Sequence, residues 1–167
     1  MHMVRVYVGI GSNVEPERHV AKAVDLMRAR FGHLDLSPIY RNKAVGFEGD
    51  DFLNAVAGFD TALEVPALKT ALDGIEVRCG RERGAARFAP RTLDLDLLLY
   101  GQKVDEGLRL PRKEILKYSF VLKPLADIAG DERHPLTDRT YGELWAEFGG
   151  ERGLEPVQLP VERADNR

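Results

Sequence analysis

The hydrophobic pattern of the first part of the chain predicts a helix among three strands. Residues 4–10 are rich in β-branched side chains and end at glycines, which is typical of a buried strand. Residues 15–31 repeat apolar side chains at intervals of three and four, the spacing of one helical face. Residues 34–45 alternate loosely and residues 52–59 are apolar, while the glycines and acids between them are typical of a hairpin loop.

The following residues predict a second helix and a further strand. Residues 65–79 again repeat apolar positions every three or four residues and stop at Gly80, residues 80–91 are a polar loop, and residues 92–100 read as a strand. Residues 110–129 combine a proline-led turn with an apolar run. The order strand, helix, strand, strand, helix, strand predicts an α+β ferredoxin-like sandwich. Two helices would then cover one face of an antiparallel sheet and leave the other face, flanked by long loops, for a substrate.

Length and composition indicate one domain. The chain has 167 residues, of which 44% are hydrophobic and 31% charged, close to the average of globular proteins. We expect a single domain over residues 1–167, with a core at about 4–148 and a charged C-terminal tail at 149–167. The net charge of -3 argues against a protein that coats nucleic acids, because such domains are usually strongly basic.

The cysteine count and the hydropathy indicate a cytoplasmic protein. Cys79 is the only cysteine, which excludes an internal disulfide and a zinc site built from cysteines. The sequence lacks an apolar run of the roughly 20 residues that a membrane span needs, and its N-terminus lacks the layout of a signal peptide. We expect no membrane partner and no nucleic-acid partner, and a monomer with a dimer as the alternative.

Two aspartates in the strand predicted over residues 92–100 point to a metal. The two-residue period places four leucines, the last of them Leu99, on one face, and Asp94 and Asp96 on the other. Neighbouring carboxylates repel unless a cation lies between them, and Mg²⁺ takes one or two carboxylates with water and phosphate oxygens. The alternative is the solvent-exposed polar face of an amphipathic strand.

The arginines before this strand favour a polyphosphate ligand. Residues 78–91 hold five arginines against the single acid Glu82, and guanidinium groups bind phosphate oxygens in pairs of hydrogen bonds. Arg91 is the strongest candidate because Pro90 stiffens its backbone three residues before Asp94. A solvated basic loop, or salt bridges to the aspartates, is the alternative. The run Gly9, Gly11, Ser12 and Asn13 reads as a tight strand-to-helix turn with an Asn or Ser cap, because it lacks a full phosphate-binding motif.

Residues 87–101, RFAPRTLDLDLLLYG, resemble the signature of the 6-hydroxymethyl-7,8-dihydropterin pyrophosphokinase family. Shorter matches are VGIGSN at 8–13, SPIY at 37–40, FLNA at 52–55 and FVLKPL at 120–125, so the resemblance covers about residues 4–148. It implies a ferredoxin-like enzyme of folate biosynthesis. Such an enzyme uses two Mg²⁺ ions to transfer pyrophosphate from ATP to the hydroxymethyl group of a reduced pterin, and it releases AMP.

The resemblance also implies a set of site residues. Its catalytic residues would be Asp94, Asp96, Arg81 and Arg91, with both aspartates as metal ligands. Its nucleotide-binding residues would be Glu76, Arg83, Leu97, Arg112 and Tyr118. Its pterin-binding residues would be Asn42, Val45, Phe52, Asn54, Phe88 and Phe120.

The chain departs from the family at several positions. Arg112 stands where members usually have histidine, Tyr118 where many have arginine, Phe88 where tryptophan is common, and Gly84 where some carry lysine. Two alternatives therefore stay open: a divergent paralogue that binds pterin or nucleotide without catalysis, and a transferase for another pterin-like acceptor. An RNA-binding ferredoxin-like domain fits less well, because the stacking aromatic pair is missing and the net charge has the wrong sign.

Overall fold

The computed structural model describes residues 2–42, 51–80, 93–150 and 152–159. Its strands are β1 (Val4–Ser12), β2 (Asp35–Leu36), β3 (Ile39–Asn42), β4 (Phe52–Thr61), β5 (Asp94–Tyr100) and β6 (Glu155–Val157). Its α-helices are α1 (Pro16–Phe31), α2 (Val65–Arg78), α3 (Glu114–Lys117), α4 (Ser119–Ala129) and α5 (Tyr141–Ala146), and a 3₁₀ turn spans Glu106–Leu108. The strands and helices expected from the hydrophobic pattern are largely present, but the strand expected over residues 34–45 is divided into β2 and β3, and its last three residues lie outside the described residues.

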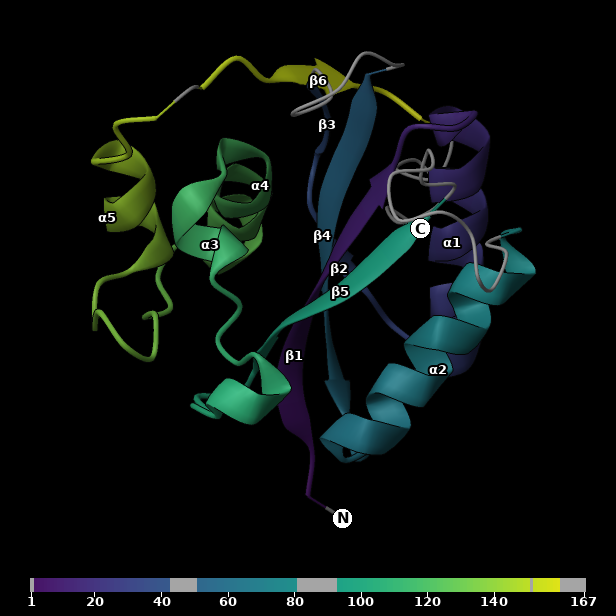
Figure 1. Cartoon of the computed structure of the whole chain (residues 1–167), viewed down its shortest axis with the longest axis horizontal. Helices are drawn as coiled ribbons and strands as arrows, with labels where there is room; N and C mark the ends of the chain where they lie inside the picture. Colours follow the sequence, from purple (N-terminus) through teal and green to yellow (C-terminus); the bar gives the residue numbers. More distant parts are fainter. Residues whose placement is uncertain (1, 43–50, 81–92, 151, 160–167) are drawn as a thin grey trace.

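An antiparallel sheet forms the centre of the molecule. Among the described residues it has six strands in the order β5-β1-β4-β3-β6, and β2 also pairs with β4. The two long strands β1 and β4 lie in the middle, with β5 beside β1 (Figure 1). The sheet confirms the prediction of an antiparallel α+β architecture. The C-terminal tail contributes to it, because β6 pairs with β3.

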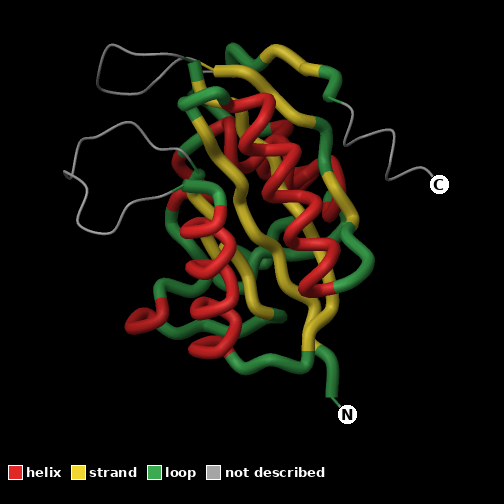
Figure 2. The backbone as a smooth tube through the Cα atoms, turned by 90° about the vertical axis from the view of Figure 1, so that its right-hand side faces the viewer, coloured by secondary structure: helices red, strands yellow, loops and turns green. Residues whose placement is uncertain are grey.

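The first face of the sheet is covered by α1 and α2. Figure 2 looks onto this side and shows the two helices in front of the strands. The apolar stripe of α1, including Val20, Val24 and Met27, is fully buried in the same cluster as Val8 of β1 and Leu95 of β5. This stripe is the one that the three-and-four spacing of the sequence predicted.

Helices cover the second face as well. Tyr7, Val56 and Leu99 form a separate buried cluster with Leu122 and Leu125 of α4, and α5 packs on α4. Figure 1 shows α3, α4 and α5 on the opposite side of the sheet from α1 and α2. The expectation that helices cover only one face is therefore wrong for this part of the fold. The apolar run at 119–129, which the sequence analysis left unassigned, is the helix that closes the second face.

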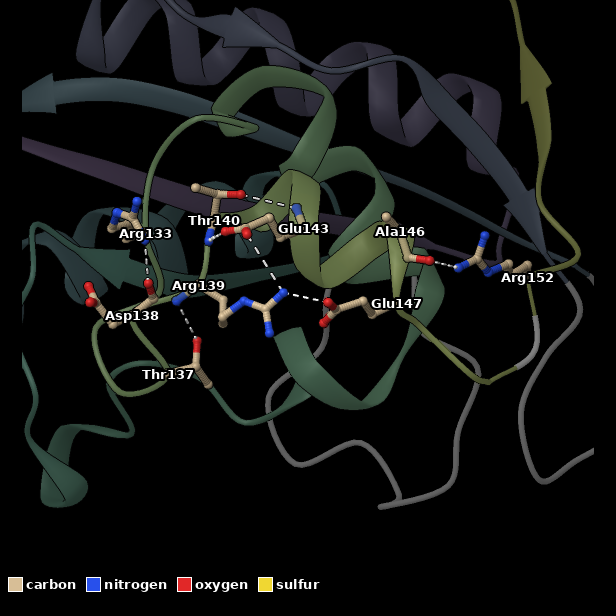
Figure 3. Close-up of polar contacts among 9 residues, drawn as sticks. All are labelled: Arg133, Thr137, Asp138, Arg139, Thr140, Glu143, Ala146, Glu147 and Arg152. Carbon is tan, nitrogen blue, oxygen red and sulfur yellow. Dashed lines mark hydrogen bonds and ion pairs between the residues drawn. The ribbon is translucent and has the colours of Figure 1, made fainter.

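Side-chain hydrogen bonds cap both ends of α5. Thr140 and Glu143 form a capping box at its start, in which each side chain bonds the backbone N–H of the other residue (Figure 3). At its end, the Arg152 guanidinium donates to the carbonyl oxygens of Trp145, Ala146 and Phe148. Both ends of this short helix are thus satisfied by side chains. In the described part of the chain, no helix has the length and apolar character needed to cross a membrane.

Candidate active site

A pocket of about 320 Å³ lies on the second face of the sheet. Its floor comes from β1, β4 and β5, one side from β3, and the other side from α3, α4 and the segment between β5 and α3. The lining residues are Gly9, Ile10, Gly11, Asn42, Phe52, Asn54, Ala55, Val56, Asp94, Asp96, Leu98, Arg112, Glu114, Tyr118, Phe120 and Val121. Eight of the predicted site residues are among them: Asp94, Asp96, Arg112, Tyr118, Asn42, Phe52, Asn54 and Phe120.

Asp94 and Asp96 both line this pocket from β5. Their partners across the antiparallel pair are Gly11 and Gly9 of β1. Residues directly opposite one another share a sheet face, so the two carboxylates have glycines, without side chains, as neighbours on that side. Both carboxylates also line the pocket, so a hydrated cation or a phosphate group could reach them from it.

The glycines lie inside β1, which corrects the prediction of a turn there. β1 continues to Ser12, and the helix N-cap is Glu15, whose side chain makes no capping bond. Gly11 faces Asn54 across the strand pair, and a Cβ atom at Gly11 would lie 3.0 Å from the Asn54 side-chain oxygen. The glycine at this position is therefore explained by a close approach on the pocket floor.

A β-bulge changes the face of the last leucines of β5. Tyr7 pairs with Leu99 and Val8 pairs with Leu97, so Leu98 has no direct partner on β1. Leu98 lines the pocket, and both Leu98 and Leu99 belong to the cluster beneath α4. The prediction that Leu99 shares a face with the earlier leucines is wrong, because strict alternation ends at the bulge.

Four of the residues predicted to bind the pterin line this pocket: Asn42, Phe52, Asn54 and Phe120. The Asn54 side-chain amide donates to the side-chain oxygen of Asn42. The rings of Tyr118 and Phe120 are stacked with centroids 4.9 Å apart. Phe52 lines the same pocket as these rings and the two amides. A flat slot with a few polar groups is a common form of small-molecule site.

Two walls of the pocket are connected through Tyr40. Its hydroxyl donates to the carboxylate of Asp127 on α4, and Lys123 of the same helix bonds that carboxylate at 2.8 Å. Burial, together with the adjacent carboxylate, raises the pKa of Tyr40 well above its usual range, so the hydroxyl keeps its proton and remains a donor. This contact fixes α4 relative to β3, which carries Asn42.

Arg112 is held against β5 close to the aspartates. Its side chain is only 13% exposed, and one guanidinium nitrogen lies 3.7 Å from an Asp96 oxygen. Its Nε donates to the carbonyl oxygen of Leu97 at 3.2 Å, and a further nitrogen lies 3.5 Å from Glu114. A permanent positive charge thus stands at the edge of the carboxylate pair.

Two predicted nucleotide-binding side chains lie elsewhere. Leu97 is buried in the core under α1 and α2, on the opposite face from the pocket, so its side chain cannot line the site. Glu76 is also buried, at 4% exposure, and accepts a hydrogen bond from the backbone N–H of Leu95 at 2.7 Å. Neither side chain lines the pocket, because both are buried within the fold, and their contacts with a nucleotide stay predictions.

Five predicted site residues lie outside the described residues: Val45, Arg81, Arg83, Phe88 and Arg91. The pocket also has residues that the sequence did not predict, namely Gly9 and Gly11 on its floor and Glu114 and Val121 on its wall. The glycines carried a signal in the sequence, since two glycines at a two-residue spacing within a strand place a flat patch on one face. The sequence holds no such signal for Glu114 and Val121, because no local pattern shows which residues of a helix will face a pocket.

Comparison with known proteins identifies the family. Residues 7–130 match the family described as 7,8-dihydro-6-hydroxymethylpterin-pyrophosphokinase. The chain belongs to this family. It is 42% identical over 142 residues to the 2-amino-4-hydroxy-6-hydroxymethyldihydropteridine pyrophosphokinase of Pseudomonas aeruginosa, covering 78% of this chain and 84% of that protein. It is 32% identical to the enzyme of the same name from Aquifex aeolicus, covering 92% and 96% of the two chains.

Solved structures of the pyrophosphokinase family share the fold. A Plasmodium falciparum HPPK-DHPS chain in complex with pteroate superposes with a TM-score of 0.69 at 10% identity, over 88% of the present chain. The present chain spans 43% of that longer protein. A folate synthesis bifunctional protein of Pisum sativum is 34% identical over 161 residues and is likewise longer, so that the match covers 31% of it.

Proposed function

We propose that this chain transfers pyrophosphate from ATP to 6-hydroxymethyl-7,8-dihydropterin in folate biosynthesis, giving AMP and the pterin diphosphate. The observation that carries the proposal is that one pocket is lined by both aspartates, by Asn54 and by the stacked rings of Tyr118 and Phe120. It brings a cation-binding pair and a heterocycle slot within one cavity. The named pyrophosphokinase relatives support the reaction type.

The slot side of the pocket suits the pterin. A volume of about 320 Å³ is at the lower end of ligand pockets, which favours one flat ring system there. The amides of Asn42 and Asn54 can pair with the ring edge, and Phe52 and Phe120 can cover its faces. Val45 and Phe88 remain proposed contacts from the resemblance. Tyr118 stacks on Phe120, so we now assign it to the aromatic wall beside the pterin rather than to the nucleotide.

The carboxylate side of the pocket suits magnesium and phosphate. Among the described residues no group of three or more His, Cys, Asp or Glu side chains could hold a metal by itself. Two carboxylates that line the same pocket nevertheless fit Mg²⁺, which completes its shell with water and phosphate oxygens. Asp94 and Asp96 would hold two such ions. When bound, the ions would neutralise phosphate charge and lower the pKa of the pterin hydroxyl.

The remaining residues would position the nucleotide. Arg112 brings a fixed positive charge to the same end of the pocket, where it can contact a phosphate oxygen. Arg81, Arg83 and Arg91 are proposed as further phosphate contacts on the basis of the family signature. In phosphoryl transfer the protein does little covalent chemistry. It catalyses the reaction mainly by holding the phosphates in position and stabilising their charge.

The fold, the domain organisation and the cellular location are also part of the proposal. The strand order β5-β1-β4-β3 with α1 and α2 on one face supports a ferredoxin-like core, to which α3, α4 and α5 are added. Residues 1–167 would form one domain, and the bacterial metabolic relatives support a cytoplasmic enzyme acting on small molecules.

The proposal is tested by separating AMP from ADP after incubation with ATP, Mg²⁺ and 6-hydroxymethyl-7,8-dihydropterin. We expect AMP to form only when both the pterin and the metal are present. Calorimetric titration with each ligand, run in parallel, tests the alternative of a divergent paralogue that binds its ligands without catalysis. Tight binding of pterin and ATP with no AMP formed would show that the chain is a binding protein rather than an enzyme.

A further inference from the structure

The outer edge of β5 is held by two side chains and by the backbone N–H of Arg112, rather than by another described strand. Within the described residues β5 lies at the end of the sheet, with β1 on one side only. An edge strand presents backbone groups that need partners. Here α2 supplies one partner through Glu76, and the segment before α3 supplies another through Arg112.

The two contacts lie on either side of Asp96. The Glu76 carboxylate accepts from the N–H of Leu95 at 2.7 Å, one residue before Asp96. The Arg112 side chain donates to the carbonyl oxygen of Leu97 at 3.2 Å, one residue after it. The Leu95 N–H belongs to the peptide group that joins Asp94 to Leu95. Fixing this peptide plane therefore fixes the backbone between the two aspartates.

Glu76 is an unusual residue for this task in a core. The residue is 4% exposed, it does not line the pocket, and the neighbouring buried positions of α2, Leu72 and Ile75, are apolar. Burying a carboxylate is unfavourable unless it accepts good hydrogen bonds. A short bond from a backbone N–H is one such bond, and an ionised acceptor makes it stronger than a neutral one.

We propose that Glu76 is a positioning residue for the metal-binding pair, holding the Asp94–Leu95 peptide so that the carboxylates of Asp94 and Asp96 are set at a fixed separation before any ligand arrives. This inference rests on the proposed function, because it assigns the pair to a cation. It changes the part given to Glu76 from nucleotide contact to backbone support. Residues that hydrogen-bond to metal ligands and orient them usually change metal affinity by about 10- to 100-fold when they are mutated.

Two conservative substitutions separate positioning from charge. Glu76→Gln keeps the length and an acceptor oxygen but loses the charge, whereas Glu76→Asp keeps the charge but is one methylene too short to reach Leu95. We expect Glu76→Asp to weaken the binding of Mn²⁺, measured by electron paramagnetic resonance with a non-hydrolysable ATP analogue, by about tenfold or more. We expect Glu76→Gln to stay within about threefold of the wild type, since the bond from Leu95 is retained.

The control is the neighbouring core residue. Ile75→Ala removes buried apolar contacts on the same helix at 5% exposure, so it lowers the melting temperature without touching the Leu95 bond. Its Mn²⁺ affinity should equal that of the wild type. Amide hydrogen exchange gives a second readout, because the Leu95 N–H should lose protection in Glu76→Asp more than the neighbouring amides of β5 do.

The outcomes are distinct. Weak Mn²⁺ binding by Glu76→Asp, with near-normal binding by Glu76→Gln and Ile75→Ala, supports the inference. Equal losses in Glu76→Asp and Ile75→Ala would overturn it, because affinity would then follow stability alone. Loss in Glu76→Gln but not in Glu76→Asp would also overturn it in favour of a charge effect. Failure of the wild type to form AMP would count against the proposed reaction, whereas these binding measurements would still decide the part of Glu76.

Discussion

Gly11 gives a sharp test of how the pocket floor positions Asn54. A Cβ atom at this position would lie 3.0 Å from the Asn54 side-chain oxygen, whereas ordinary contacts begin near 3.4 Å. In Gly11→Ala the Asn54 side chain must therefore move by a few tenths of an ångström. The move disturbs its hydrogen bond to Asn42 and the direction in which both amides present themselves to a ligand.

The expected size follows from one hydrogen bond. Losing a good neutral hydrogen bond costs about 1 kcal/mol, which corresponds to about a fivefold loss of pterin affinity. Gly9→Ala is the matched control, because it lies two residues away on the same strand and its Cβ would meet only Leu98, at an ordinary 3.5 Å. Both alanines suit a strand backbone, so neither variant should lose global stability.

Calorimetric titration with the dihydropterin measures the effect, and Asn54→Ala closes a double-mutant cycle. If the contact between Gly11 and Asn54 is responsible, Gly11→Ala should have little further effect once Asn54 is gone. An undiminished loss in the Asn54→Ala background would refute the reasoning. So would a Gly9→Ala variant that loses as much affinity as Gly11→Ala.

Three further predictions address the metal pair, a buried histidine and a helix cap. Asp96→Asn should lower the rate of AMP formation by about 10²-fold or more with little change in melting temperature, since the side chain is 53% exposed; a near-normal rate would remove Asp96 from the metal site. His134 is buried, and its ring Nδ1 accepts backbone N–H bonds. Burial lowers the pKa of this histidine in the folded protein. Below about pH 6.5 the unfolded chain therefore takes up the proton more readily than the folded one, and stability falls as the pH drops. Urea unfolding at pH 7.5 and 5.5 should show a smaller pH effect in His134→Gln, and an equal effect would argue against this histidine. Thr140→Ala should cost about 1 kcal/mol of stability by urea unfolding through loss of the α5 cap, and no measurable loss would show the cap to be unimportant.

The sequence predicted the metal pair because a strand repeats every two residues. Asp94 and Asp96 were placed together by that period, and the structure finds both in one pocket. The same rule failed at Leu99, where a bulge opposite Tyr7 and Val8 shifts the register. A bulge depends on how two distant strands pair, so the local sequence of β5 does not reveal it.

The support around the pair was harder to predict. Glu76 was assigned to the nucleotide, whereas its bond to Leu95 depends on how α2 packs against β5, which a helical period alone does not define. The helices on the second face were missed for a similar reason. The apolar run at 119–129 shows that a segment is buried but does not show which side of the sheet buries it.

Phosphorus NMR of a complete reaction tests the central claim most directly. The account predicts that ATP, Mg²⁺ and 6-hydroxymethyl-7,8-dihydropterin give AMP and a pterin diphosphate in equal amounts, with two phosphorus signals on the pterin product. Formation of ADP and a pterin monophosphate, or no phosphorus on the pterin with folded protein that binds both ligands, would contradict it.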